Sequence, residues 1–415
     1  MSRKKMLSRS ERLKWFNHAR FGMFIHWGLN SLPRRAPEPS GGVLGQRLLD
    51  ADAYAPVAGR FRPTKFDPDA WVALAKEAGM KYIVLTTRGH NGFCIFDSKV
   101  SDFTSVKTAA GRDFVADFVR ACRRGGMKIG FYYSLLDWRF PGYFKGPEKD
   151  PEGWQECVRY AHAQVRELCT QYGKIDILWY DGGWVPWATD VAEWWHVSPS
   201  DVWRVRALNR EVRRLQPHIL INKRGGPVGD FDTPEQHITA SAPGRYWESC
   251  MTMNNNWYYR AQDRNWKSRT ELIHDLATCA GGGGNYLLDV GPRPDGAIPA
   301  AAVKRLKEIG AWMKANGEAI QGAARTGFDP QHVGVASARG NVVYLHVFNW
   351  PGEQICLPGV SPRVSSAHFL ATGRKIGVAQ DRDRLILYDL PGKAPDESDT
   401  VIALKTEVRS LRRVR

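Results

Sequence analysis

Short apolar segments alternate with amphipathic segments through the first three quarters of the chain. The apolar segments have the length and composition of strands and lie at 21–28, 81–87, 127–134, 175–181, 218–224, 245–250 and 285–292. Segments with helical spacing lie at 67–80, 112–126, 154–173, 201–216, 268–284 and 301–317. Repeated strand–helix units predict a parallel sheet of the α/β class. About seven strands within roughly 320 residues favour a (β/α)8-like TIM barrel over an open doubly wound sheet.

The pattern changes after residue 325. NVVYLHVFNW, RLILYDLP and DTVIALK alternate apolar and polar residues and are separated by Gly, Pro, Asn and Asp. This alternation predicts a C-terminal antiparallel β-sandwich. We therefore expect a barrel domain over residues 8–324 and a sandwich domain over residues 325–415.

Polar side chains stand where the predicted barrel strands end. The run IDILWYD ends on Asp181, and two glycines follow it. Such an acid is either a helix cap or a functional group. Other strand ends carry His26, the run Thr86–Asn91, Tyr132 to Ser134, and Asn222 to Arg224. Because catalytic groups of parallel barrels come from the carboxyl ends of strands, the set predicts one shared pocket that includes Asp181. Taken singly, His26 could be a buried structural histidine and Arg224 an ion-pair partner.

Several reaction classes lack their residues in this chain. No strand offers paired histidines as metal ligands, and no GxSxG segment, Cys–His arrangement or phosphate-binding loop is evident. The 7 cysteines are scattered without a CxxC pair, which argues against a disulfide framework and a zinc site and favours buried free thiols. We therefore expect neither a metal nor a cofactor.

Carboxylate chemistry in an aromatic-rich pocket remains. Tryptophans near the strand ends are Trp27, Trp138, Trp179, Trp184, Trp247 and Trp257. Together with Asp181 they suggest a glycosidase, which needs a second carboxyl group. The segment 229–250 supplies Asp230, Asp232, Glu235 and Glu248. Glu235 lies in a Pro-bounded loop, where partial exposure suits a group that both donates and accepts a proton. Glu248 lies within a predicted strand.

The formal net charge of +16 would suit an acidic partner such as nucleic acid, an anionic polysaccharide or a membrane surface. No nucleic-acid motif accompanies the charge, so a well-solvated basic surface is preferred and no nucleic-acid partner is expected. No apolar run has the length of a membrane span. The N-terminal segment lacks the apolar core of a secretory signal. We expect a cytoplasmic protein, or a periplasmic or secreted one whose signal was removed; the oligomeric state stays open.

The sequence resembles the α-L-fucosidases of glycoside hydrolase family 29. Matching segments, in order, are FGMFIHWGLNSLP, KYIVLTTRGHNGFCIFDSKVSDF, GFYYSLLDW, IDILWYDGGW, DFDTPEQ, WESCMTMNNNWYY, GGGNYLLDVGPRPDG and WMKANGEAI. They extend over roughly residues 15 to 320 and include several specific motifs. The family has a barrel followed by a β-sandwich, in agreement with the pattern above.

The resemblance implies a retaining exo-glycosidase that removes terminal α-L-fucose, or a closely related sugar, from glycans. It implies that Asp181 is the nucleophile. The acid/base position varies in the family: DFDTPEQ favours Glu235, and WESC makes Glu248 the rival. Residues that match positions binding the sugar or shaping the pocket are His26, His90, Tyr133, Trp179 and Arg224.

Two departures from the family pattern concern the substrate. The family commonly has Lys-His-His-Asp-Gly-Phe where this chain has Arg88 to Phe93, so a sugar-binding histidine is replaced by Gly89 and an acid by Asn91. A common Glu-Trp pair is also missing from LPRRAPEPSGGVLG. These losses keep open a different deoxy- or galacto-configured sugar. They also keep open a non-catalytic carbohydrate-binding protein on the same scaffold.

Overall fold

The first structural unit is a nearly closed parallel barrel. The computed structural model describes residues 7–33, 51–185, 199–226, 229–242, 244–361 and 363–407. Among these residues, one sheet has 8 strands in the order β5-β4-β3-β2-β1-β8-β7-β6. The strands are β1 (Phe21–Ile25), β2 (Tyr82–Arg88), β3 (Lys128–Ser134), β4 (Ile177–Asp181), β5 (Leu220–Ile221), β6 (Phe231–Asp232), β7 (Tyr246–Thr252) and β8 (Asn285–Val290). A parallel bridge between Asn222 and Phe231 joins the two edge strands β5 and β6.

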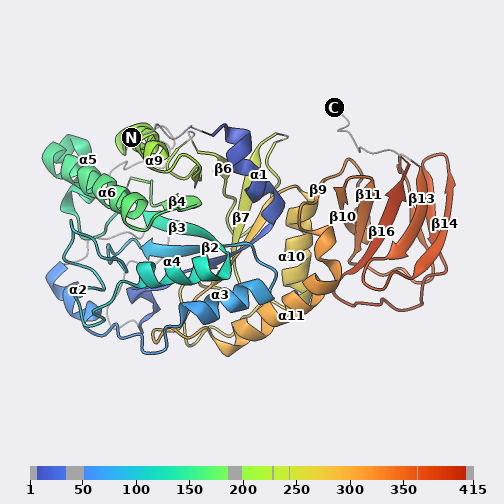
Figure 1. The fold of residues 1–415 in the computed structure, drawn as a ribbon, viewed down its shortest axis with the longest axis horizontal. Helices are drawn as coiled ribbons and strands as arrows, with labels where there is room; N and C mark the ends of the chain where they lie inside the picture. The colour runs from blue at the N-terminus through green and yellow to red at the C-terminus, as the bar shows by residue number, and fades with distance from the viewer. Residues whose placement is uncertain are drawn as a thin grey trace.

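Helices surround the barrel on its outer side (Figure 1). Those that follow the strands are α3 (Pro68–Glu77), α4 (Phe114–Gly125), α6 (Pro151–Gln171), α9 (Val205–Leu215), α10 (Arg269–Gly281) and α11 (Ala300–Asn316). Additional elements are α1 (Arg9–Ala19), η1 (Leu29–Ser31), α2 (Ala51–Ala58), α5 (Pro141–Lys149), α8 (Pro199–Val202) and η3 (Gly317–Ala319). The side chains of Asp67, Asp113 and Ser268 accept hydrogen bonds from the first turns of α3, α4 and α10, which fixes where these helices begin.

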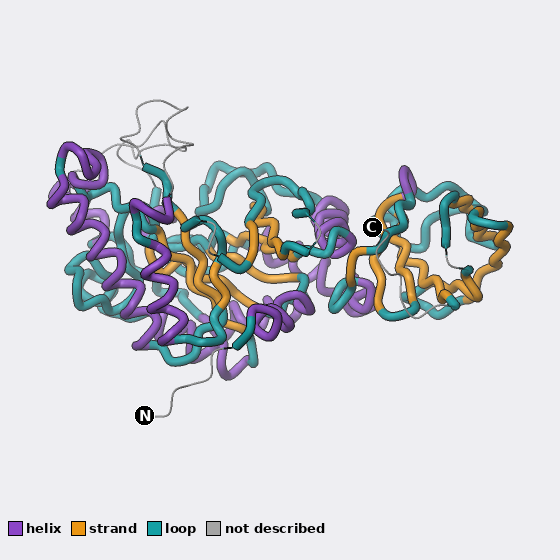
Figure 2. The backbone as a smooth tube through the Cα atoms, turned by 90° about the horizontal axis from the view of Figure 1, so that it is seen from above, coloured by secondary structure: helices purple, strands orange, loops and turns teal. Residues whose placement is uncertain are grey.

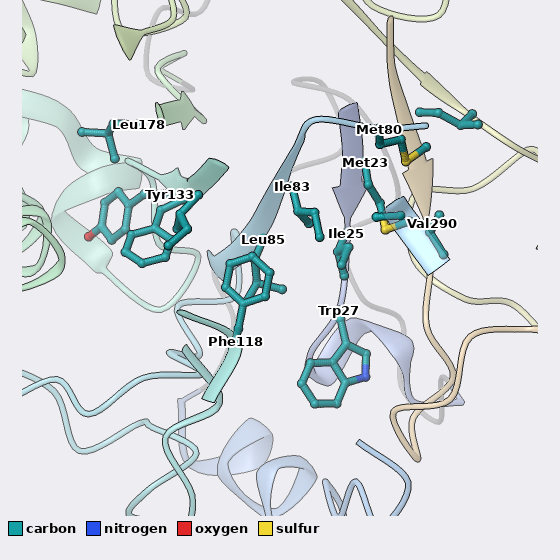
Figure 3. Packing of buried hydrophobic residues seen from close by; sticks show 14 of the residues in the cluster. Met23, Ile25, Trp27, Met80, Ile83, Leu85, Phe118, Tyr133, Leu178 and Val290 are labelled. Atoms are coloured by element: carbon teal, nitrogen blue, oxygen red, sulfur yellow. The ribbon is translucent and has the colours of Figure 1, made fainter. Parts of the chain in front are cut away.

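The barrel strands are buried on both faces. Figure 3 shows the outward-facing cluster, in which Ile25, Ile83 and Leu85 pack near Phe118 of α4. The alternate residues form a separate cluster inside the barrel that includes Phe24, Val84, Tyr132, Trp179 and Leu287. Such two-sided burial is why the strands read as continuous apolar runs.

Helix α1 closes the amino end of the barrel. Leu13, Phe16 and Ala19 belong to the interior cluster. The Asn285 side chain, at the start of β8, donates to the Phe16 carbonyl at 3.0 Å. No helix was predicted here from the sequence, because the segment is mostly polar and the helix buries few of its residues. Its burial depends on the barrel above it.

The second unit is an antiparallel sheet, also of 8 strands within the described residues, in the order β12-β15-β14-β13-β16-β11-β10-β9. Its strands are β9 (Ala324–Arg325), β10 (Gly334–Arg339), β11 (Val342–Val347), β12 (Ile355–Leu357), β13 (Val364–Phe369), β14 (Lys375–Asp381), β15 (Arg384–Tyr388) and β16 (Thr400–Thr406), and η4 (Gln331–Val333) precedes β10. The sheet turns over itself, so that Leu345 and Leu404 from one half share a core with Leu385 and Leu387 from the other. This two-layer arrangement is the predicted β-sandwich.

The two units pack tightly against each other. Helices α10 and α11 lie between the barrel and the second sheet in both views (Figures 1 and 2). Trp312 donates to the Asp399 carbonyl at 3.0 Å, and Arg269 pairs with Asp396 at 2.8 Å. Tyr344 and Val401 face the barrel core, while their neighbours along the same strands face the sandwich core.

The predicted fold class is therefore confirmed, with differences in detail. Strand β6 was not predicted, because two residues are too few to carry a pattern, and β5 has two residues where the sequence suggested seven. All 7 cysteines are free, and only Cys356 is exposed. Within the described part of the chain, no helix is long and apolar enough to cross a membrane.

Candidate active site

Asp181 is the last residue of β4, at the carboxyl end of the barrel. It is not a helix cap, because no helix follows it through Val185. Gly182 adopts a φ of 64°, and a Cβ there would lie 2.8 Å from both a Leu136 carbon and the Ser134 hydroxyl. Only glycine fits this turn, which explains why the apolar strand stops on a carboxylate followed by glycine.

The Asp181 carboxylate accepts hydrogen bonds from several groups. Tyr132 donates to Oδ2 at 2.8 Å, and Arg224 Nη1 lies 3.3 Å from Oδ1. His90 Nε2 lies 3.8 Å from Oδ2. Burial alone would raise the pKa of Asp181, but the Arg224 and His90 charges and hydrogen bonds from Tyr132 and the Gly182 backbone outweigh it and lower the pKa. Asp181 is thus an ionised carboxylate in a mostly buried place.

Arg224 links Asp181 to Glu235. Its Nη2 lies 2.6 Å from Glu235 Oε2, while Nη1 faces Asp181. The guanidinium lies over the Trp179 ring, 4.8 Å from its centroid, and its Nε donates to the Thr233 hydroxyl at 3.0 Å. These contacts fix the plane of the guanidinium, so one cation holds two carboxylates that come from different parts of the chain.

Glu235 is anchored yet accessible. The flanking residues hydrogen-bond to β7: Cys250 N donates to the Pro234 carbonyl and Gln236 N donates to the Cys250 carbonyl, both at 3.0 Å. The Glu235 side chain nevertheless keeps 40% of its surface exposed. A carboxyl group in this position can exchange protons with solvent or with a bound molecule.

Glu248 lies in a different environment. It is 0% exposed, accepts from Trp179 Nε1 at 3.0 Å and accepts from the Tyr82 hydroxyl. Burial raises the pKa of Glu248 to about 7, and the two hydrogen bonds oppose this only in part. The carboxyl group therefore lies inside the barrel with both oxygens occupied, at the edge of the same Trp179 ring whose face Arg224 covers.

Two histidines lie near Asp181: His90 directly, and His26 through Tyr132. His26 Nδ1 lies 2.7 Å from Asp289 Oδ1, and its ring packs against those of Tyr132 and Trp257 with centroids 5.3 and 5.0 Å apart. Burial raises the pKa of Asp289 to about 6, against the opposing effect of His26. The pair fixes the orientation of the His26 ring, as carboxylate–histidine pairs do elsewhere.

His90 is held by Ser134, whose hydroxyl lies 2.8 Å from its Nδ1. Burial lowers the pKa of His90, and the Asp181 charge opposes this only in part. Trp138 and Trp184 flank the ring, each with a centroid 5.4 Å away. They form an aromatic wall beside Asp181.

Tyr133 does not join this group, contrary to the sequence-based prediction. Its hydroxyl donates to Gln164 at 2.9 Å and accepts from Arg88 at 3.2 Å, and its side chain lies in the outer core (Figure 3). Alternation along β3 explains the difference, because Tyr132 and Ser134 point to the pocket side and Tyr133 to the helices. Tyr132, stacked on Trp179 with centroids 5.7 Å apart, takes the place expected for Tyr133.

Two pocket residues were not singled out from the sequence: Asp289, and Tyr258, whose ring lies 5.3 Å from that of His26. Tyr132 was named only as one of three residues at the end of its strand. The acid in NYLLDV could have found Asp289. Tyr258 lies in an irregular loop and has no such signal. Trp27 and Trp247 of the predicted aromatic set pack outside the barrel, against Phe66 and Gly284.

The arrangement supplies the parts that sugar chemistry requires. It has a buried ionised carboxylate, an exposed carboxyl group on another element, a cation between them and aromatic walls. Within the described residues, no group of three or more His, Cys, Asp or Glu side chains is placed to hold a metal ion. The segment 34–45, where the Glu-Trp pair is missing, lies outside the described residues.

Comparison with known proteins finds α-L-fucosidases as relatives of this chain. A family model described as α-L-fucosidase matches residues 2–318. The tissue α-L-fucosidase of Mus musculus is 30% identical over 414 residues, covering 92% of this chain and 88% of that protein. The α-L-fucosidase of Dictyostelium discoideum is 29% identical over 377 residues, covering 83% and 79%.

Solved structures agree. α-L-Fucosidase isoenzyme 1 from Paenibacillus thiaminolyticus superposes with a TM-score of 0.85 at 34% identity, covering 96% of this chain and 99% of that one. An α-L-fucosidase of Bacteroides thetaiotaomicron, trapped as a covalent intermediate with 2-fluoro-fucosyl fluoride, has a TM-score of 0.84 at 26% identity and covers 98% of both chains.

Proposed function

The chain belongs to the α-L-fucosidase family, and we propose that Asp181 and Glu235 are its nucleophile and its acid/base. It is a glycoside hydrolase with a retaining mechanism, and its substrate is a fucosylated glycan. The observation that carries the residue assignment is the Arg224 guanidinium, which contacts one carboxylate with each terminal nitrogen. One of these carboxylates is buried and ionised, and the other is accessible.

In the first step, Asp181 attacks the anomeric carbon while protonated Glu235 gives its proton to the departing glycosidic oxygen. The carbon–oxygen bond to the leaving group breaks as the bond to Asp181 forms. Tyr132 donates a hydrogen bond to Asp181 Oδ2 and so orients the attacking carboxylate. The product is a neutral glycosyl ester and an ionised Glu235.

In the second step, ionised Glu235 takes a proton from water, and that water attacks the anomeric carbon and releases Asp181. One negative charge thus moves from Asp181 to Glu235 and back during each turnover. Arg224 contacts both groups, so it stabilises the charge in either position without moving. This explains why a single cation between the two carboxylates suits double displacement.

Glu248 fits the acid/base role less well. Its carboxyl group is fully buried and its oxygens are used by Tyr82 and Trp179. We propose instead that Glu248 positions Trp179, which forms the floor of the pocket beneath Arg224.

Hydrolysis of 4-nitrophenyl α-L-fucoside tests the assignment. Asp181→Ala should lose several orders of magnitude in kcat, and turnover that survives would remove Asp181 from its role. Glu235→Ala should lose about 10²–10⁴-fold on a glycan substrate, whose leaving group needs protonation. With 4-nitrophenyl α-L-fucoside, added azide should restore turnover by forming a fucosyl azide. Glu248→Ala should show no azide rescue. Rescue of Glu248→Ala but not of Glu235→Ala would reverse the assignment.

Calorimetry and a glycoside panel test the non-catalytic alternative. Sugar binding measured by calorimetry, with no turnover of any glycoside in a broad panel, would favour a non-catalytic carbohydrate-binding protein. Nothing in the site favours it, because both carboxylates and the cation between them are present.

A further inference from the structure

Gly89 and Tyr258 meet at the mouth of the barrel. Gly89 directly follows the last residue of β2 and is buried. A Cβ atom at Gly89 would lie 2.8 Å from the Tyr258 hydroxyl oxygen, and the next atom, Asn91 Oδ1, would be 3.8 Å away. Real Cβ contacts do not approach this closely, so the Tyr258 hydroxyl occupies the space that a side chain at position 89 would need.

The glycine is required for space and not for backbone conformation. The φ angle of Gly89 is outside the left-handed range that favours glycine, whereas that of Gly92, three residues on, is 75°. A larger residue could therefore adopt the backbone at position 89 if Tyr258 were smaller. The two positions compete for one volume.

That volume belongs to the pocket. The Tyr258 ring meets the His26 ring edge-on, with centroids 5.3 Å apart and an interplanar angle of 81°. His26 in turn packs against Tyr132, which donates to the Asp181 nucleophile. Tyr258 is half-buried, and its hydroxyl lies beside Gly89 in the same wall as His26.

The loop that carries Tyr258 is held in place by its neighbours. A Cβ at Gly291, just after β8, would lie 2.8 Å from both the Trp257 carbonyl and the Tyr259 amide, so the loop lies directly on that glycine. Arg260 donates to the Asn30 carbonyl, and Asn91 donates to the Asn30 side chain at 2.8 Å. Asn91, the second departure from the family pattern, thus helps to join the loops around Tyr258.

We propose that Tyr258 is a substrate-binding residue whose hydroxyl, in the space left by Gly89, hydrogen-bonds a hydroxyl of the bound fucose. This inference rests on the proposed function and extends it to specificity. It explains why the pocket wall beside position 89 is still filled by a polar group although Gly89 has no side chain. A phenol can donate and accept, as an imidazole can, but it stays uncharged through the neutral and acidic range.

Tyr258→Phe tests the inference, because it removes the hydroxyl and keeps the ring against His26. The expected result is a kcat/KM for 4-nitrophenyl α-L-fucoside that falls by about tenfold, mostly through KM, as for one lost hydrogen bond. L-Fucose binding, measured by calorimetry, should weaken by a similar factor. Tyr246→Phe is the matched control at the opposite end of the barrel, where Tyr246 begins β7, and it should change neither value.

Gly89→Ala gives an independent check through the geometry. In the wild type the new methyl group would push the Tyr258 hydroxyl aside and should cost a similar factor. In the Tyr258→Phe background the nearest ring carbon is 4.0 Å from the added Cβ, so the same change should cost nothing further. A double-mutant cycle that is strongly non-additive supports the inference, and additive effects overturn it.

Other results also decide the matter. If kcat/KM and L-fucose binding of Tyr258→Phe both stay within twofold of the wild type, the inference is wrong. A fall accompanied by a matching loss of thermal stability, with L-fucose binding unchanged, assigns Tyr258 a structural role and overturns it too. If the wild type lacks turnover but its L-fucose binding weakens in Tyr258→Phe, the inference stands and the proposed catalytic function fails.

Discussion

The buried carboxyl group of Glu248 predicts how the free energy of unfolding depends on pH. In the folded protein the pKa of this buried carboxyl is raised from an ordinary 4.5 to about 7. The folded state therefore keeps the proton to a higher pH than the unfolded chain does. Between about pH 4.5 and pH 7, unfolding releases a proton, and stability falls as the pH rises. Each pH unit of this window is worth about 1.4 kcal/mol, so the whole window is worth about 3 kcal/mol.

Glu248→Gln should remove this loss. Glutamine resembles the protonated acid: its oxygen can accept from Trp179 and its amide can donate to the Tyr82 hydroxyl. At pH 4 the variant and the wild type should have similar stability. At pH 8 the variant should be more stable by about 3 kcal/mol, which corresponds to roughly 3–4 °C in Tm for a chain of 415 residues.

The assay is the melting temperature of both proteins from pH 4 to pH 8 at one scan rate, followed by intrinsic tryptophan fluorescence. Only the difference between the two proteins is used, since all other titrating groups are shared. A difference that stays constant with pH would refute the reasoning, because it would mean that the Glu248 pKa is similar in the folded and unfolded states. Activity should stay within about threefold of the wild type if Glu248 is a positioning residue.

Glu235→Gln is the matched comparison. It should lose activity, because glutamine can neither donate nor accept the catalytic proton. The opposite pattern, with activity lost only in Glu248→Gln, would identify Glu248 as the acid/base.

Two further changes test the surroundings of the site. Tyr132→Phe removes a hydrogen bond that lowers the pKa of Asp181, so the acid limb of kcat/KM against pH should move to higher pH. The control Tyr133→Phe should leave this limb in place. Equal shifts in the two variants would refute the assignment of Tyr132 to the pocket face and Tyr133 to the helix face. Asp137→Asn leaves the fully buried Arg88 guanidinium without its carboxylate partner at 2.7 Å and should cost about 3–5 kcal/mol of stability, measured by thermal or urea unfolding. A loss below 1 kcal/mol would show that the pair is not needed to hold Arg88.

The fold was largely predictable because its signals are local. Strands β1 to β4 and β8 are mostly apolar runs of five residues or more, and the helices between them show apolar stripes and in several cases caps. Strands β5 and β6 have two residues each, so neither carries a period. The division of the chain near residue 324 stays a prediction, although the second sheet begins at Ala324.

The site was predictable only in part. Asp181 could be found because an acid between an apolar strand and two glycines is visible in the sequence. The sequence pointed to Tyr133, whereas Tyr132 contacts Asp181 in the structure. A strand with a period of two presents two faces, and only the closed barrel decides which face lies inside. Glu235 and Glu248 are both acids in one short stretch, and their difference in exposure arises from partners on β2 and β4.

The sequence by itself determined which segments become strands, and it placed a carboxylate, two histidines and an arginine at their ends, because these properties depend on neighbours along the chain. The tertiary structure alone decided which tyrosine faces the pocket, which glutamate reaches solvent, and that the Tyr258 hydroxyl fills the space beside Gly89. Those features depend on contacts between residues from about 45 to 170 positions apart, and no local period encodes them.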